Sequence, residues 1–340
     1  MTRETLLVGD WVTALKAAAE PTRLRLLLLL AASEFNVKDL TVILGQSQPR
    51  LSRHLKLLSE AGLIERYREG SWVYFRLGDR NAIQRRVKDL LGAVDPFEPI
   101  VLRDCERANA LKREREAAAQ AFFRAHAGDW DRIRALHVSE AEVESAMRDC
   151  LGEGPFQLFV DLGTGTGRIL ELFDGHYERG LGIDINQAML THARSKLSAS
   201  GSSRAQVRHG DIYNLGLNDG TVSVVTMHQV LHFLSDPRRA VIEAARVLEP
   251  GGKLLIVDFA PHELEFLRDT QSHDRLGFSA ALVGQWLAEA GLEPRLTRDL
   301  KPSAAETSGK LTVSIWLAER PQAALASPSP RTQAPIEVTR

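Results

Sequence analysis

The chain has 340 residues, of which 44% are hydrophobic and 26% are charged, and its formal net charge is −1 at pH 7. This composition is typical of a globular protein of two or three domains, and it excludes a fibrous or wholly disordered chain. The longest apolar run, 26–32, is too short to cross a bilayer, and the N-terminus lacks the pattern of a secretory signal. Since two cysteines cannot form a disulfide framework, we expect a cytoplasmic protein without membrane contact.

Residues 1–80 carry 12 basic and 9 acidic side chains, so the small positive excess lies at this end of the chain. The apolar spacing predicts helices at about 11–18, 24–32, 38–44 and 47–61. Thr22 and Ser47 are placed to cap the second and the fourth of them. Alternating apolar and polar residues in 63–68 and 72–77 then predict a β-hairpin.

The fourth predicted helix is amphipathic. Leu51, Leu55 and Leu58 share one face, and the polar side chains point away from it. A short helix with an exposed basic face suits the DNA major groove, and a following hairpin can meet phosphates or the minor groove. The alternative is a solvated helix and hairpin used for protein contact. The candidate DNA-binding residues are Gln48, Arg50, Ser52, Arg53, His54 and Lys56 on the helix and Arg66 and Arg68 on the hairpin.

The middle of the chain is rich in charge and in helical pattern. Mixed charge along 105–124 predicts a solvent-exposed connecting helix, and another helix is expected over 138–150. We divide the chain into an N-terminal domain, a helical linker and cap, a second domain and a disordered tail, at 1–95, 96–150, 151–320 and 321–340.

Short apolar runs alternate with helical stretches in the second domain. This alternation of strand and helix patterns predicts βαβ units and a mostly parallel sheet. The runs are 156–160, 180–183, 205–209, 222–227 and 253–257.

A glycine-rich turn, Asp161-Leu162-Gly163-Thr164-Gly165-Thr166-Gly167, follows the first of these runs. Glycines let a backbone turn tightly and approach a ligand closely. The dinucleotide fingerprint G-x-G-x-x-G does not fit, because Arg168 and Leu170 stand where its last glycine would be. The alternative is a tight turn in a sheet that binds nothing.

Carboxylates follow the next two predicted strands. Asp184 is placed to accept both ribose hydroxyls of a nucleoside, and Asp211 to accept from the exocyclic amine of an adenine. Together with Asp161 they lie at the carboxyl ends of consecutive strands. We therefore expect one crevice at that edge of the sheet.

Residues 156–260 resemble the class I S-adenosylmethionine-dependent methyltransferases. The resemblance rests on the glycine loop, on Asp184, on Asp211-Ile212 and on 246–254, which looks like the family's turn before its fifth strand. It implies an α/β Rossmann-like domain with a seven-stranded, mostly parallel sheet, S-adenosylmethionine as cofactor, S-adenosylhomocysteine as product, and no metal. The implied cofactor-binding residues are Asp161, Gly163, Thr164, Gly165, Gly167, Asp184, Ile185, Asp211, Ile212, His228 and Gln229.

His228 closes the fourth predicted strand, where the crevice opens, and is the candidate catalytic base. A base is needed only for an acceptor that must lose a proton, and a histidine that merely caps the strand or contacts the cofactor is the alternative. His232 would share a helix face with His228, but no third ligand is near, so no metal site is expected. No Asn-Pro-Pro-Tyr follows this strand, which favours a small-molecule acceptor. Weaker candidates are Asp258 and His262 for catalysis and Phe122, Phe123 and Trp130 as a roof.

Residues 8–80 resemble the ArsR/SmtB-type winged helix-turn-helix repressors, through 15–27, 46–58 and 62–64. The resemblance implies an α+β winged helix-turn-helix domain and a homodimer formed by the first and last helices. Twofold symmetry would then imply a palindromic double-stranded DNA operator. Metal-sensing members carry cysteines where Asn36 and Lys38 stand here, so we expect no arsenite or soft-metal sensing at that position.

Two functions fit this combination. The first is a transcriptional regulator whose methyltransferase domain binds S-adenosylmethionine or S-adenosylhomocysteine as effector or cosubstrate. The second is an active small-molecule methyltransferase that regulates its own operon through the winged helix. A DNA-binding module with a degenerate partner domain is a third reading. The acceptor, the operator sequence and the direction of regulation are not predicted.

Overall fold

The computed structural model describes residues 7–69, 71–78, 81–134, 139–302 and 311–322. Apart from 321–322, the tail that is expected to be disordered lies outside these ranges, and so does residue 138. Within them, no helix is long and apolar enough to cross a membrane.

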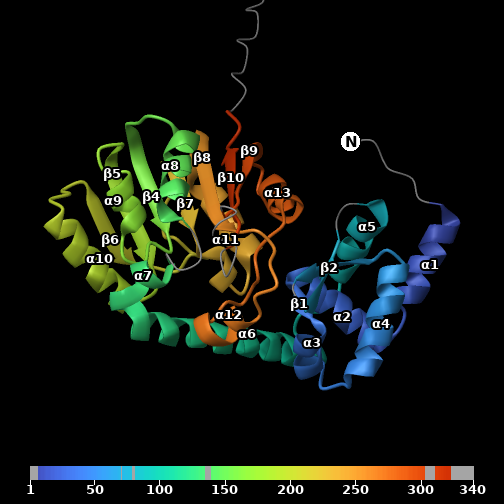
Figure 1. Cartoon of the computed structure of the whole chain (residues 1–340). Helices are drawn as coiled ribbons and strands as arrows, with labels where there is room; N and C mark the ends of the chain where they lie inside the picture. The colour runs from blue at the N-terminus through green and yellow to red at the C-terminus, as the bar shows by residue number, and fades with distance from the viewer. Residues whose placement is uncertain (1–6, 70, 79–80, 135–138, 303–310, 323–340) are drawn as a thin grey trace, which may run out of the picture.

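The N-terminal domain packs helices against a small sheet (Figure 1). The hairpin of β2 (Ile64–Glu69) and β3 (Trp72–Leu77) confirms the strands predicted over 63–68 and 72–77, and the sheet order is β1-β3-β2. The remaining elements are α1 (Val8–Ala18), α2 (Pro21–Ala32), β1 (Phe35–Asn36), α3 (Val37–Leu44), α4 (Gln48–Glu60) and α5 (Ala82–Leu91).

Local sequence explains the helix-turn-helix formed by α3 and α4. Asn36 and Asp39 make a reciprocal capping box at the start of α3, and Gly45 ends this helix with a positive φ of 65°. Leu51, Leu55 and Leu58 of α4 are buried, as its amphipathic pattern predicts. The predicted cap of α2 is wrong, because Glu20 accepts from the backbone N–H of Arg23 while Thr22 is buried.

The long helix α6 (Pro99–His126) runs from the N-terminal domain to the second domain (Figure 1). The connecting helix predicted over 105–124 lies within α6, and most of its residues are exposed as expected, but Ala108 and Ala119 are buried. Mixed charge is compatible with this burial since several of these charges pair with residues of both domains. η1 (Ala127–Asp129), α7 (Trp130–Arg134) and α8 (Glu140–Leu151) follow.

The second domain is built on a seven-stranded sheet of order β6-β5-β4-β7-β8-β10-β9. The pairs among β6, β5, β4, β7 and β8 are parallel, whereas β10 is antiparallel to both its neighbours. The strands are β4 (Phe156–Leu162), β5 (Tyr177–Asp184), β6 (Ala205–His209), β7 (Val222–His228), β8 (Leu248–Phe259), β9 (Glu293–Leu300) and β10 (Val313–Glu319). This arrangement confirms the Rossmann-like fold class.

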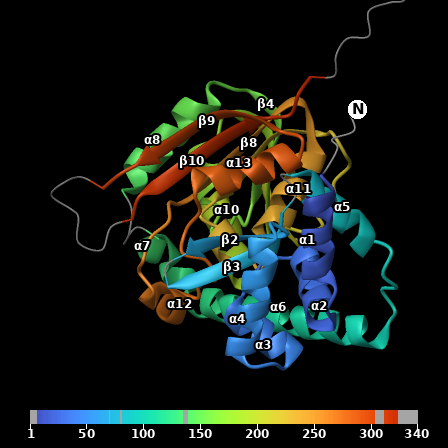
Figure 2. The same ribbon diagram turned by 90° about the vertical axis from the view of Figure 1, so that its right-hand side faces the viewer.

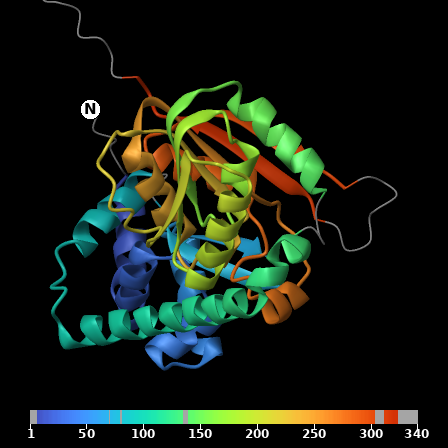
Figure 3. The same ribbon diagram turned by 90° about the vertical axis from the view of Figure 1, so that its left-hand side faces the viewer.

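Helices cover both faces of this sheet (Figure 3). One core lies under α11 (Pro237–Val247) and α13 (Ala280–Glu289), and the other under α8 and α9 (Arg168–Leu172). Along β4, Val160 belongs to the first core and Phe159 to the second, as expected for alternating side chains of a strand buried on both faces. α10 (Gln187–Ala199), η2 (Leu231–Phe233) and α12 (Phe266–Gln271) complete the domain.

The hairpin of the N-terminal domain lies against the second domain near α12 and α13 (Figure 2). Phe75 packs into the core of the N-terminal domain, whereas Tyr67 packs against the core under α11 and α13. Glu69 accepts from Arg268 and from the backbone N–H of Leu276. The two faces of one small sheet are therefore shared between the two domains.

Candidate functional site

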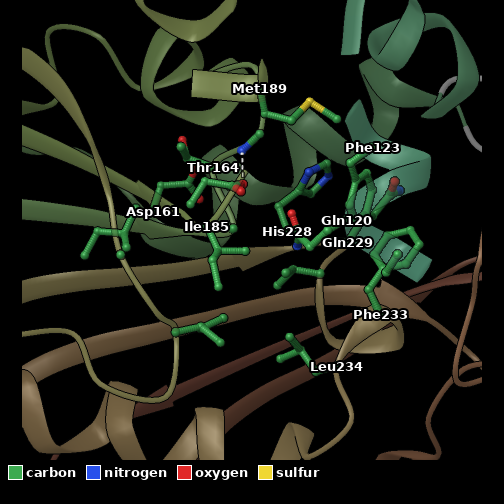
Figure 4. A pocket seen from close by; sticks show the side chains of 18 of the residues that line it. Gln120, Phe123, Asp161, Thr164, Ile185, Met189, His228, Gln229, Phe233 and Leu234 are labelled. Carbon is green, nitrogen blue, oxygen red and sulfur yellow. Dashed lines mark hydrogen bonds between the residues drawn. The ribbon is translucent and has the colours of Figure 1, made fainter. Parts of the chain in front are cut away.

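A cavity of about 180 Å³ opens at the carboxyl edge of the parallel strands, where the crevice is predicted (Figure 4). Its walls come from the glycine loop after β4, from the residues after β5, β6 and β7, and from α6 and Trp130. Because α6 contributes one wall, the cavity is enclosed partly by the helix that also contacts the N-terminal domain.

The glycine loop brings the backbone close to the cavity. Gly163 and Gly165 have φ values of 69° and 53°, a region that side chains disfavour. A Cβ atom on Gly163 would lie 2.3 Å from Cγ2 of Val230, so this position also lacks room for a side chain. The N–H of Gly165 donates to Oδ2 of Asp184 at 2.9 Å and thereby joins the loop to β5.

Asp184 ends β5 beside the cavity. Its carboxylate accepts from the backbone N–H of Gly165 and, at 2.8 Å, of Asn186. Burial raises the pKa of Asp184 above its usual value, and the backbone donors oppose that rise. The carboxylate is therefore desolvated but held in place by the backbone.

Two residues of the cavity wall carry buried polar atoms without a hydrogen-bond partner. Thr164 Oγ1 and Gln229 Nε2 are buried and have no hydrogen-bond partner, and both residues line the cavity (Figure 4). Buried polar groups in native proteins are almost always hydrogen-bonded, so such atoms at a cavity wall indicate a missing polar ligand. A nucleoside cofactor with several hydroxyl and amine groups fits this requirement.

The structure brings most of the residues implied to bind the cofactor to this cavity, although their role stays a prediction. Gly167 does not line it. Its positive φ of 79° begins α9, and a Cβ there would lie 3.3 Å from Cβ of Ala193, which makes it a packing position against α10. The residues that do line it are Asp161, Gly163, Thr164, Gly165, Asp184, Ile185, Asp211, Ile212, His228 and Gln229.

The sequence did not reveal the contribution of α6. Gln120 accepts from the amide of Asn186 through its backbone oxygen at 3.1 Å and its side-chain oxygen at 2.9 Å. Glu116 accepts from the hydroxyl of Ser235 at 2.5 Å. Glu116 and Gln120 both line the cavity. Since α6 was expected to be exposed, only its Phe122-Phe123 pair hinted at this wall.

His228 and His232, which follow the fourth predicted strand, lie in different surroundings. His228 ends β7 and lines the cavity. His232 is buried, and its Nδ1 lies 2.7 Å from Oδ1 of Asp258. The expectation of a shared helix face is wrong, because Gln229 has a positive φ of 52° and the chain then enters the short 3₁₀ helix η2. Among the described residues, no group of three His, Cys, Asp or Glu is placed to hold a metal ion.

Aromatic rings form the part of the cavity between α6, α7 and η2. The ring centroid of Phe123 lies 5.1 Å from that of Trp130 and 4.7 Å from that of Phe233, and all three residues line the cavity. Phe122 does not line it and stacks against His126 instead. The charged residues among the described lining are all carboxylates, so the cavity has an apolar wall and a negative potential.

The candidate DNA-binding side chains lie on the surface of the N-terminal domain with one exception. His54 is half-buried, with Nδ1 3.7 Å from Oε2 of Glu20, and burial lowers the pKa of its imidazole. The structure thus turns His54 toward α2 rather than toward a ligand. The exposed candidates are Gln48, Arg50, Ser52, Arg53 and Lys56 on α4 and Arg66 and Arg68 on β2.

Known proteins match the two ends of the chain separately. Residues 20–66 match the model of bacterial regulatory proteins of the arsR family, and residues 160–256 match the model of a methyltransferase domain. The arsenical resistance operon repressor of Escherichia coli is 49% identical over 63 residues, covering 18% of this chain and 54% of that protein.

Relatives of the second region are methyltransferases. YcgJ of Bacillus subtilis, an uncharacterized methyltransferase, is 30% identical over 105 residues, covering 31% of this chain and 42% of YcgJ. Its crystal structure aligns over 54% of this chain and 100% of YcgJ with a TM-score of 0.45 and 18% identity. The ubiquinone/menaquinone biosynthesis C-methyltransferase UbiE of Vibrio parahaemolyticus is 33% identical over 121 residues, covering 34% of this chain and 47% of UbiE.

The chain spans about half or less of the length of these curated relatives. The first matched segment runs from the start of α2 into β2, and the second runs from the end of β4 into β8 and so reaches all five parallel strands. The chain therefore joins an ArsR-family winged helix-turn-helix domain to a class I S-adenosylmethionine-dependent methyltransferase domain.

Proposed function

We propose that the protein is a DNA-binding transcriptional regulator whose methyltransferase domain binds S-adenosylmethionine and S-adenosylhomocysteine, as effector or as cosubstrate. The observation that carries the proposal is the cavity itself, whose wall includes α6, a helix in direct contact with the helix-turn-helix. Differential affinity of the ligand for the DNA-bound and free states would be the switch.

The cavity residues fit an S-adenosylmethionine-type ligand. Asp184 would accept from the ribose hydroxyls and Asp211 from the adenine amine, with Ile212 against the adenine ring. The orphaned Thr164 Oγ1 and Gln229 Nε2 would regain hydrogen bonds. S-adenosylmethionine carries a positively charged sulfonium, which the carboxylate-lined cavity favours.

The test is the affinity of the full chain for a DNA duplex taken from upstream of its own gene. Binding is measured by fluorescence anisotropy without ligand, with S-adenosylmethionine and with S-adenosylhomocysteine. We expect at least one ligand to change the dissociation constant by about fivefold or more. Equal affinities under all three conditions would contradict an effector role.

We further propose a homodimer formed through α1 and α5, with each protomer reading one half of a palindromic operator. The support is an exposed apolar surface on these helices, since Val8, Val12, Leu15 and Leu90 are each more than 40% exposed. Such contiguous exposed apolar residues mark interaction surfaces.

The double substitution Val12→Glu and Leu15→Glu should convert the dimer into a monomer, because two carboxylates per protomer would be buried at the interface. Sedimentation velocity would show the mass fall by half. Ile242→Glu, at a residue that is 39% exposed on α11, is the matched control and should leave the mass unchanged. A dimer that survives the double substitution excludes this interface.

A second candidate function is methyl transfer to a small molecule. The observation that favours it is the aromatic wall of Phe123, Trp130 and Phe233, which lies beside the proposed cofactor residues. Since the charged lining residues among those described are carboxylates, we propose an acceptor with an apolar body and no negative charge. When bound, S-adenosylmethionine supplies the methyl group. His228 would hold the proton that an acidic acceptor loses.

His228→Asn tests this role. With a neutral phenol or thiol as acceptor, S-adenosylhomocysteine formation by the variant should fall at least tenfold, while its affinity for S-adenosylmethionine changes less than threefold. The pH profile of kcat should lose its acid limb. Unchanged turnover in the variant would contradict a base at this position, and absence of turnover with any acceptor in a metabolite extract would contradict the enzymatic function.

A further inference from the structure

The helix α6 is attached to the helix-turn-helix domain along its first half. Asp104 is buried and accepts from Arg25 of α2 through two hydrogen bonds, at 2.6 Å and 2.8 Å. Arg107 donates to the backbone oxygen of Ile43, in α3, at 3.1 Å. A bidentate, buried arginine–carboxylate pair fixes relative orientation as well as distance, so α6 and this domain move together.

The second half of the same helix is attached to the proposed cofactor site. Gln120 holds the amide of Asn186, two residues after Asp184, and Phe123 faces the cavity (Figure 4). A ligand that fills the cavity touches this wall directly. Because α6 is continuous over 28 residues, a displacement of its wall segment also displaces its first half.

Arg115 lies between these two halves and pairs with a carboxylate of each domain. It donates to Oδ1 of Asp39, and its other terminal nitrogen lies 3.3 Å from Oδ1 of Asp274. Asp39 is buried and belongs to the capping box that begins α3. Burial raises the pKa of Asp39, and the guanidinium of Arg115 and the backbone N–H of Asn36 oppose that rise.

Asp274 is connected to the opposite wall of the cavity. The backbone N–H groups of Asp274 and Arg275 donate to the backbone oxygen of His232, at 2.9 Å and 3.0 Å. Phe233, the next residue, lines the cavity. Two walls of the cavity, one on α6 and one at η2, thus converge on the ion pairs of Arg115.

The neighbouring residue Arg275 holds the hairpin. It is fully buried and donates to Tyr67 at 2.8 Å and to Glu34 at 2.5 Å, and it lies 3.2 Å from Glu69. Segment 274–276 therefore contacts the capping residue of α3 through Arg115 and the hairpin through Arg275. One short segment therefore supports both α3, on which α4 packs, and the hairpin.

We propose that Arg115 is a positioning residue that couples occupancy of the cofactor cavity to the orientation of the recognition helix α4. The proposal rests on the proposed function, in which the cavity binds S-adenosylmethionine or S-adenosylhomocysteine. Filling the cavity fixes α6 against η2, and Arg115, held by Asp274, fixes Asp39 and hence α3, on which α4 packs. An empty cavity leaves α6 and η2 free to separate, and the Asp39–Arg115–Asp274 arrangement no longer has one geometry.

The experiment measures coupling in the full-length chain. The dissociation constant for the upstream DNA duplex is determined with and without saturating S-adenosylhomocysteine, and the ratio of the two values reports the coupling. Arg115→Gln removes both ion pairs. Asp274→Asn removes only the ion pair of Arg115 with the methyltransferase domain and keeps the ion pair between Arg115 and Asp39. Arg113→Gln, at an exposed arginine of the same helix, is the matched control.

We expect a ratio well away from one in the wild type and in Arg113→Gln, and a ratio within about twofold of one in Arg115→Gln and Asp274→Asn. Affinity for S-adenosylhomocysteine, measured by calorimetry without DNA, should change less than about threefold in all variants. If Arg115→Gln fails to fold by circular dichroism, Asp274→Asn alone decides the result.

The outcomes distinguish the effector role of the ligand from the coupling role of Arg115. A wild-type ratio of one contradicts the effector role and the coupling together. A wild-type ratio that persists in Arg115→Gln and Asp274→Asn overturns the role of Arg115 and leaves the effector role intact. Loss of S-adenosylhomocysteine binding in both variants would also overturn it, because these residues would then support the cavity rather than connect it to DNA binding.

Discussion

Asp184→Ala should weaken the binding of both S-adenosylmethionine and S-adenosylhomocysteine by about 100-fold or more. Hydrogen bonds to a charged group contribute about 1.5–3 kcal/mol each, and the carboxylate would accept two from the ribose. The substitution also removes the acceptor of the Gly165 and Asn186 N–H groups, so the glycine loop loses its link to β5. Isothermal titration calorimetry on the full chain measures the effect.

The pH dependence of binding has a defined sign. Burial raises the pKa of Asp184, and the ligand needs its ionised form, so affinity falls as the pH decreases toward that pKa. The fall should begin at a higher pH than an ordinary aspartate would cause, and Asp184→Ala should abolish it.

Asp174→Ala is the control, because Asp174 is exposed in the same domain and its carboxylate bonds Ser202 far from the cavity. It should leave both affinities within twofold of the wild type. Operator affinity without ligand should be unchanged in both variants. Ligand affinity within threefold of the wild type in Asp184→Ala would exclude the proposed ribose contact.

The double substitution Arg50→Ala and Arg53→Ala should reduce operator affinity by about 100-fold or more. Both guanidinium groups are exposed on α4, and a base contact by arginine contributes about 1–3 kcal/mol, counted twice in a dimer. If the two arginines contact phosphates instead, the slope of the logarithm of the DNA-binding constant against the logarithm of the salt concentration should decrease in magnitude by about 0.9 for each lost contact. Anisotropy titrations at several salt concentrations distinguish these two cases.

The control removes the same charge elsewhere. Arg113 and Arg124 are exposed on α6, and Arg113→Ala with Arg124→Ala should change operator affinity by less than about threefold. S-adenosylhomocysteine binding should be unaffected by either pair. If both pairs weaken DNA binding equally, then net charge and not the position of α4 determines affinity, and the recognition-helix assignment is wrong.

Much of the proposed cofactor site is predictable because its signals are local. The glycine loop needs positive φ angles over a few residues, and these restrict the residue type directly. Asp184 and Asp211 follow from strand ends, since parallel strands end at one edge of the sheet. The buried leucines of α4 follow from helical periodicity in the same way.

The surroundings of some residues depend on distant partners and were not predicted. His54 has the spacing of the exposed face of α4, yet it is half-buried, with its Nδ1 3.7 Å from Oε2 of Glu20 at the start of α2. His232 leaves the cavity because its partner is Asp258, 26 positions further on, at the end of β8. Gly167 was grouped with the loop by its glycine pattern, whereas its neighbour in space is Ala193 of α10.

The sequence by itself therefore determined the two domains, the glycine loop with its carboxylates and the basic face of α4, because each depends on patterns within a strand, a turn or a helix. Only the tertiary structure decided that α6 is a shared wall and support, and that the hairpin is covered on one face. Those facts depend on pairs such as Glu34 with Arg275, 241 positions apart. Two of the charged side chains of α6, Lys112 and Arg115, contact both domains in the folded chain.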